Sequence, residues 1–148
     1  MSDSGRRDSS TQFAQTNALA DAACAAQLRQ EFSVWLRRYF ALDATKVRDV
    51  VLAVNEALAN AAEFAYSTVD EPGAMHLRAD YDGAAAVLTV TVTDDGAWRI
   101  ADPETNSHSR GRGIPLMRAL ADRASIDSSS AGTRVRLEWN HVAAAQAP

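Results

Sequence analysis

A carboxylate and an amide stand four residues apart, at Glu56 and Asn60, in the segment LAVNEALANAAEFAY, residues 52–66. On a helix with about 100° of rotation per residue, the two side chains would lie about 40° apart on one face. A carboxylate can take a proton from a hydroxyl group, and an amide oxygen is a suitable ligand for Mg²⁺. The spacing could therefore place a general base beside a metal ligand.

A solvated helix face is the alternative interpretation, because Asp49 and Glu63 fall on the same side of the helix. Small residues surround the pair, however, whereas exposed helix positions more often carry long charged side chains. These small residues are Ala53, Ala57 and Ala59. They would leave room for a ligand.

A second candidate site lies in the segment VTDDGAW, where Asp94 directly follows alternating apolar residues that end at Val92. A carboxylate at the end of such a strand can accept a hydrogen bond from an exocyclic amine. Gly96 would let a flat ring approach the backbone. An Asx-type turn after a strand is the alternative, and these residues are equally compatible with it.

A third candidate site is the glycine-containing segment SRGRGIPLMRAL. Gly111 and Gly113 precede an Ile-Pro pair that suits the first turn of a helix, and free N–H groups at a helix start can bind phosphate. Arg110 and Arg112 add positive charge. The alternative is an ordinary loop and helix start. The segment is neither a P-loop nor a dinucleotide-binding motif, since Leu116 stands at the third glycine position.

Helical periodicity predicts the elements that carry the first pair. Apolar residues recur at helical spacing over residues 21–40, and Asp43 could cap a second helix that contains Glu56 and Asn60. The second helix has a tight apolar stripe that should lie on a core. The stripe comprises Val47, Val50, Val51, Val54, Leu58, Ala61 and Ala65.

Alternation with a period of two predicts a β-hairpin over residues 75–92, with Asp82 and Gly83 as a type I′ turn. A short helix around LMRALADR, residues 116–123, and a last strand over residues 133–139 follow. Two helices ahead of mainly antiparallel strands predict an α+β fold, a two-layer sandwich with the helices on one face of the sheet.

Composition bounds the possible functions. The chain has 148 residues, 47% of them hydrophobic, which suits one domain; its net charge of −4 disfavours direct binding to nucleic acid or to an anionic membrane. Cys24 is the only cysteine and excludes an internal disulfide, and no signal peptide is visible, so we expect a cytoplasmic protein. We expect a disordered tail over residues 1–10, one domain over 11–140 and a C-terminal tail over 141–148.

The order of the motifs resembles that of the GHKL, or histidine kinase-like, ATP-binding superfamily. That order is Glu-x-x-x-Asn on a helix, Asp-x-Gly after a strand, Gly-x-Gly before a helix, and Gly-Thr opening a last strand. The resemblance is closest to the anti-sigma-factor serine protein kinases of the partner-switching branch, and it covers roughly residues 11–140. The N-box of that family reads like E-A-x-x-N-A-x-x-H-A-Y, and EALANAAEFAY, residues 56–66, matches all but the histidine.

The resemblance implies the GHKL (Bergerat) fold and assigns a role to each candidate. On this basis Asn60 would bind Mg²⁺ at the ATP phosphates, Glu56 would be the general base for a substrate serine, and Asp94 would bind the adenine amino group. The remaining nucleotide-binding positions are Gly96 beneath the ring, Arg110, Gly111, Arg112 and Gly113 at the phosphates, and Thr133 near the adenine.

The resemblance also implies a function. The chain would be an ATP-dependent protein serine/threonine kinase that phosphorylates an anti-anti-sigma partner of the STAS type, sequesters a sigma factor and forms a homodimer. Phe64 replaces the N-box histidine, and Trp98 stands where the wider superfamily often has a second glycine. These departures keep open a regulatory binding module with little phosphotransfer. A detached histidine-kinase catalytic domain is disfavoured, because neither N-terminal helix carries a histidine; an interaction protein without nucleotide is the last alternative.

Overall fold

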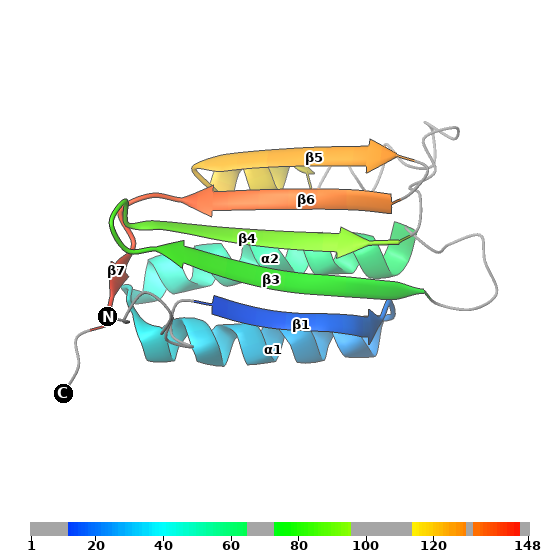
Figure 1. The fold of residues 1–148 in the computed structure, drawn as a ribbon, viewed down its shortest axis with the longest axis horizontal. Helices are drawn as coiled ribbons and strands as arrows, with labels where there is room; N and C mark the ends of the chain where they lie inside the picture. Colours follow the sequence, from blue (N-terminus) through cyan, green and yellow to red (C-terminus); the bar gives the residue numbers. More distant parts are fainter. Residues whose placement is uncertain (1–11, 65–72, 96–113, 130–131, 146–148) are drawn as a thin grey trace, which may run out of the picture.

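One antiparallel sheet, covered on one face by helices, forms the body of the molecule (Figure 1). The computed structural model describes residues 12–64, 73–95, 114–129 and 132–145. The sheet has five strands in the order β1-β3-β4-β6-β5, and each neighbouring pair is antiparallel. The strands are β1 (Gln12–Leu19), β3 (Ala74–Asp82), β4 (Val87–Asp94), β5 (Arg123–Ser129) and β6 (Gly132–Trp139). The predicted α+β sandwich is confirmed.

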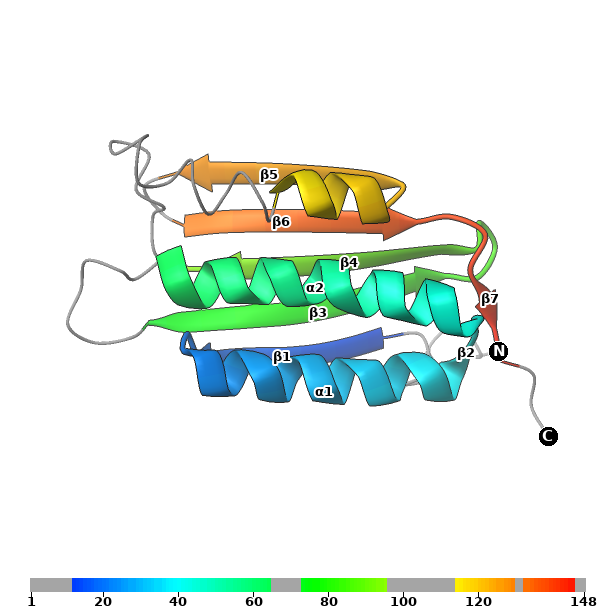
Figure 2. The ribbon, with the colours of Figure 1, turned by 180° about the vertical axis from the view of Figure 1, so that it is seen from behind.

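Two long helices lie side by side on the sheet, α1 (Ala22–Tyr39) next to β1 and α2 (Ala44–Phe64) across β3 and β4 (Figure 2). Each begins at an aspartate cap. The Asp21 carboxylate accepts a hydrogen bond from the Cys24 N–H at 2.8 Å, and the Asp43 carboxylate accepts one from the Lys46 N–H at 2.7 Å. Both helices therefore start where the sequence predicts them.

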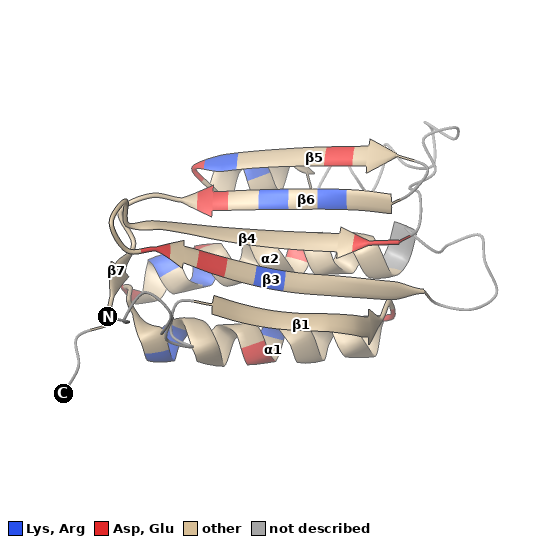
Figure 3. Cartoon of the chain, viewed as in Figure 1, with Lys and Arg blue, Asp and Glu red and all other residues tan. Residues whose placement is uncertain are grey.

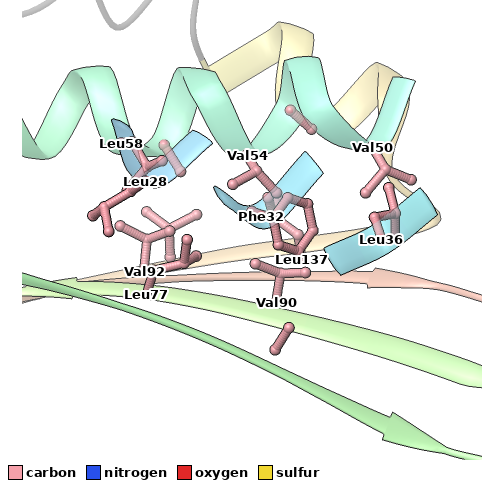
Figure 4. Packing of buried hydrophobic residues seen from close by; sticks show 14 of the residues in the cluster. Leu28, Phe32, Leu36, Val50, Val54, Leu58, Leu77, Val90, Val92 and Leu137 are labelled. Carbon is pink, nitrogen blue, oxygen red and sulfur yellow. The ribbon is translucent and has the colours of Figure 1, made fainter. Parts of the chain in front are cut away.

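A core of aliphatic and aromatic side chains joins the two layers (Figure 4). Val50, Val54 and Leu58 of α2 point toward the strands and have no exposed surface. They face residues of β3, β4 and β6 that are also buried. The labelled strand residues are Leu77, Val90, Val92 and Leu137. The centre of the apolar stripe predicted for the second helix thus forms the contact with the sheet, whereas Val51 is half-buried at its edge and Ala65 lies outside the described residues.

The third helical segment spans residues 114–120 and lies against β5 and β6 (Figure 2). Met117 is fully buried there, and the indole N–H of Trp139 donates to the carbonyl of Leu120 at 2.9 Å. The predicted helix extended to Arg123, but that residue opens β5. The helix is therefore shorter at its C-terminal end than the sequence indicated.

The sequence did not predict β1 and β5, the two edge strands. In β1 only Phe13 and Ala18 are partly buried, and a bulge with Asn17 at φ 60° interrupts the alternation. Phe13 stacks against α1, 5.5 Å from Trp35 between ring centroids. An edge strand that buries so few side chains carries little periodic signal.

The turn between β3 and β4 also differs from its prediction. Asp82 remains in the strand and pairs with Val87, so the loop comprises the four residues 83–86. The Asp82 carboxylate accepts the N–H groups of Ala84 and Ala85 at 3.0 and 3.2 Å, and Ala86 takes the left-handed conformation at φ 58°. The two-residue type I′ turn was wrong, because the aspartate side chain supports a longer loop.

Part of the expected C-terminal tail is ordered. Val142 is fully buried, and β7 (Ala143–Ala144) pairs with β2 (Phe40–Ala41), the short strand that joins α1 to α2. The Tyr81 hydroxyl donates to the Val142 carbonyl at 2.6 Å. The expectation that this segment would be loose was wrong, since its backbone pairs with the helix connection.

The opposite face of the sheet is polar. Figure 3 shows charged residues along β3, β5 and β6. Arg78, Arg134 and Arg136 are exposed and alternate with buried residues of their strands, so they lie on this face. The threonines of β4 alternate with its buried residues and are half-buried here. Within the described part of the chain, no helix combines the length and the apolarity needed to cross a bilayer.

Candidate functional site

Asp94 occupies the end of a central strand, at the boundary between the two layers. It is the last residue of β4 and is 5% exposed. Leu88, Val90 and Val92, the other buried residues of the strand, alternate with exposed or half-buried neighbours, so Asp94 shares their helix-facing side. A carboxylate therefore ends a run of apolar core residues, a position that needs a polar partner.

Thr133 lies directly opposite Asp94 on β6 and is 3% exposed. Its hydroxyl oxygen is 3.2 Å from that of Ser128, the register partner of Thr133 on β5. Three neighbouring strands thus place a carboxylate and two hydroxyls in one row. Ser128 was not among the predicted site residues, because its strand was not predicted.

Gly132 allows β6 to begin this close to Asp94. Its φ is +147°, and a Cβ atom at this position would overlap the carbonyl oxygen of Asp94. A side chain here would both strain the backbone and push the two strands apart. The sequence showed only that a glycine precedes Thr133.

Asn60 lies near the C-terminal end of α2, at the same end of the molecule as the end of β4 (Figures 1 and 2). It is 4% exposed, and its amide nitrogen Nδ2 is buried with no hydrogen-bond partner among the residues that the structure describes. Ala53 and Ala57 have no exposed surface. The solvated-face alternative is therefore excluded for Asn60, because Asn60 and these alanines lie together on the buried side of the helix.

Glu56 lies one turn before Asn60 and is half-buried. At about 100° per residue it is about 40° further from the centre of the buried face than Asn60. Its side chain thus borders the buried region and remains accessible to a second molecule. This position suits a group that must reach a substrate rather than one that packs in the core.

A hollow of about 340 Å³ opens at this end of the sheet. Asp94, Thr133 and Gly132 line it, together with residues of β4, β5 and β6. The other lining residues are Thr93, Asp127, Ser128, Ser129 and Arg134. Its size falls at the lower end of the range for small-molecule sites, roughly 300–1,000 Å³.

His76 of β3 pairs in register with Thr93, the neighbour of Asp94, and was not among the predicted site residues. Its Nδ1 accepts the N–H of Asn17 at 3.0 Å, and its Nε2 is 3.6 Å from the carboxylate of Asp95. The imidazole thus connects the bulge of β1 to the residue that follows Asp94. No sequence spacing indicates this contact, because it depends on the register of two strands.

The family to which the chain belongs is decided by its sequence match. Residues 18–139 match the model of the histidine kinase-like ATPase domain, well over half of the chain. This chain is a histidine kinase-like ATPase domain. The matched segment contains all the elements described above except β7 and most of β1.

A solved structure has the same fold as this histidine kinase-like ATPase domain. It is the crystal structure of the RsbU and RsbW domains of Rv1364c from Mycobacterium tuberculosis, with a TM-score of 0.67 and 23% sequence identity. The match covers 92% of this chain and 33% of that one. The present chain therefore spans about a third of the length of the protein it matches.

The described residues of this histidine kinase-like ATPase domain fit a nucleotide with a divalent cation. A buried amide with an unpaired N–H can donate to a phosphate oxygen and offer its own oxygen to Mg²⁺. The buried Asp94 carboxylate can accept a hydrogen bond from an amine. The remaining predicted positions, Gly96, Trp98, Arg110, Gly111, Arg112 and Gly113, and the side chain of Phe64, lie outside the described residues.

Proposed function

We propose that this chain is an ATP-binding anti-sigma regulatory factor with protein serine kinase activity. It phosphorylates an anti-anti-sigma partner of the STAS type, sequesters a sigma factor and acts as a homodimer. The family match supports ATP binding, and the motif order and N-box support the partner-switching branch. The RsbW domain named in the similar structure agrees with that branch.

The observation that carries the proposal is the buried amide of Asn60, whose Nδ2 finds no partner in the described part of the chain. A buried donor without a partner costs about 1–3 kcal/mol in the free protein. Such a cost is typical of functional sites, where a ligand supplies the missing partner. In this proposal the Asn60 oxygen binds Mg²⁺ and its N–H donates to a phosphate oxygen.

The other residues divide the work of binding and transfer. Asp94 accepts a hydrogen bond from the adenine amino group. Thr133, its register partner on β6, lies near the adenine. Glu56 takes the proton from the serine hydroxyl of the partner, as a half-buried carboxylate at the border of the site can do. ATP, when bound, supplies the phosphoryl group. Gly96, Arg110, Gly111, Arg112 and Gly113 complete the nucleotide site.

A regulatory module that binds ATP or protein partners without transfer is the second candidate, because Phe64 replaces the histidine of the N-box. The two functions differ in one measurement. Radiolabelled ATP is incubated with the protein and purified STAS-type partners, while calorimetry follows ATP binding with Mg²⁺ or with EDTA. Label transferred to a partner serine supports the kinase. Binding without transfer to any partner supports the module.

Two variants separate the proposed roles. Asn60→Ala should lose Mg²⁺-dependent ATP binding. Without nucleotide, its thermal stability should fall less than when other buried side chains are shortened, because the substitution removes a donor that has no partner among the described residues. Glu56→Gln should bind ATP normally but transfer phosphate about 10² to 10⁴ times more slowly.

Asn55→Ala is the matched control for these variants. Asn55 lies on the same helix but hydrogen-bonds to Arg29 of α1, at 3.5 Å, so its loss should leave ATP binding unchanged. Unchanged ATP affinity in Asn60→Ala would refute the assignment of the metal ligand. Transfer at the parental rate by Glu56→Gln would refute the assignment of the base.

A further inference from the structure

Figure 2 shows α1 and α2 side by side over the sheet. A groove runs between the two helices, on the side of the helix layer that faces away from the sheet. It encloses about 810 Å³, more than the hollow beside Asp94. Its lining extends from Arg29 to Arg37 on α1 and from Ala44 to Asn55 on α2. At about 1.5 Å per residue these stretches are roughly 12–16 Å long, which corresponds to about two to three turns of a helix.

The floor of the groove is apolar. Val47 and Val51 lie one turn apart on α2, and Leu42 and Ala44 continue the surface toward the helix connection. Leu52 is 37% exposed and is one of the few large hydrophobic residues with so much exposed surface in the described ranges. Val47 and Val51 belong to the edge of the apolar stripe predicted for α2, and Val47 is only 8% exposed, so the floor of the groove continues the buried face of the helix outward to the exposed Leu52.

The rim of the groove is basic. Of the described residues that line it, the charged ones are Arg29, Arg37 and Arg48, and none is a carboxylate. Among the residues that the structure describes, Arg37 and Arg48 form no ion pair; both are exposed. This concentration of positive charge occurs in a chain whose net charge is −4. The groove therefore differs in sign from the molecule as a whole.

We propose that this groove binds an acidic amphipathic helix of a partner protein. An apolar helix face of about two to three turns would lie on Val51 and Leu52, and flanking carboxylates would pair with the arginines on both rims. A second copy of this chain is a poor occupant, because a two-fold contact at the groove would bring arginine rims together. Nucleic acid would leave the apolar floor without a matching surface.

This surface is separate from the nucleotide site. The groove involves the N-terminal half of α2 and its outward side, whereas Asn60 lies buried near the other end. The inference therefore does not rest on the kinase activity. A partner in the groove and a nucleotide beside Asp94 could be present at the same time.

The test uses a fluorescein-labelled synthetic peptide of about four helical turns, with leucines at i, i+3, i+4 and i+7 spacing and glutamates on both flanks. Binding is measured by fluorescence anisotropy on the full chain at low salt. A peptide of the same composition in scrambled order and vesicles of anionic lipid are measured in parallel. The amphipathic peptide should bind more tightly than both.

Three variants locate the binding. Arg37→Glu combined with Arg48→Glu should lower the affinity for the peptide by about tenfold or more. The loss should be smaller in high salt, because exposed charges are screened beyond about 10 Å at 0.1 M salt. Leu52→Ser should weaken it at every salt concentration. Arg38→Glu is the matched control: Arg38 is adjacent to Arg37 but packs over Tyr39, 5.5 Å from the ring centroid, outside the groove. It should bind within about twofold of the parent, a difference that corresponds to a few tenths of a kcal/mol.

Several results would overturn the proposal. Equal binding of the scrambled peptide would show simple charge attraction, and stronger binding of vesicles would assign the groove to lipid. If Arg38→Glu and the groove variant lose the same amount of peptide affinity, the peptide does not bind specifically in the groove. Absence of peptide binding would also refute it, provided that circular dichroism shows each variant folded.

Discussion

Replacement of Gly132 by alanine tests the geometry on which the candidate site depends. Gly132 opens β6 at φ +147°, directly beside the end of β4. A methyl group at this position would overlap the carbonyl oxygen of Asp94. The backbone must therefore change its conformation, or β6 must move away from β4, and both changes alter the surroundings of the Asp94 carboxylate.

The expected cost follows from these two effects. A residue other than glycine in a sparsely populated backbone region costs about 1–3 kcal/mol. The overlap adds to this, because its partner is backbone in a central strand and cannot rotate away. We expect the free energy of unfolding to fall by about 2–4 kcal/mol, which for a chain of this size lowers Tm by roughly 4–16 °C.

Thermal unfolding followed by circular dichroism measures the loss of stability, and calorimetry measures ATP binding below the transition. Gly83→Ala is the matched control, because a Cβ there meets only the Tyr81 ring at 3.7 Å and Gly83 does not have a positive φ. It should be neutral or stabilise by up to about 1 kcal/mol. If Gly132→Ala unfolds at the same temperature as Gly83→Ala and binds ATP equally well, the close approach of β6 to Asp94 is wrong.

Two further predictions concern single side chains. Asp94→Ala should lower the affinity for ATP about tenfold or more, since a hydrogen bond to a charged group contributes about 1.5–3 kcal/mol. It should also abolish any preference for ATP over GTP. An unchanged ratio of the two affinities would contradict the adenine contact. The pKa of the Cys24 thiol is raised, mainly by its hydrogen bond to the Asp21 side chain and then by burial. Less of the reactive thiolate is therefore present at a given pH. Asp21→Ser keeps a capping side chain but removes the carboxylate, so iodoacetamide should alkylate Cys24 faster at pH 8, and an equal rate would argue against this cause.

The central elements could be predicted from the sequence because each has a strong local signal. Asp43 and the apolar stripe that follows it define α2, and the alternation of β3, β4 and β6 reflects their burial on one face. Asp94 could be assigned to the end of a strand for the same reason. Its pairing with Thr133 could not, since strand register depends on contacts between distant segments.

The edge strands show why the rest could not be predicted. β5, RASIDSS, contains a single large apolar residue, Ile126, so its alternation of half-buried and exposed positions resembles a polar loop. Ser128 and its hydrogen bond to Thr133 were missed with it. The burial of Asn60 was open for another reason: a helical wheel places it beside alanines but cannot say that the sheet covers them.

The short pairing of β2 with β7 has a practical consequence for anyone who shortens this chain. The family match ends at Trp139, three residues before the fully buried Val142. A truncation at that boundary would remove the acceptor of the Tyr81 hydroxyl and the N–H that Ala145 donates to the carbonyl of Tyr39. The corner between the two long helices would then be open to water and to proteases, so boundaries for expression should include residue 145.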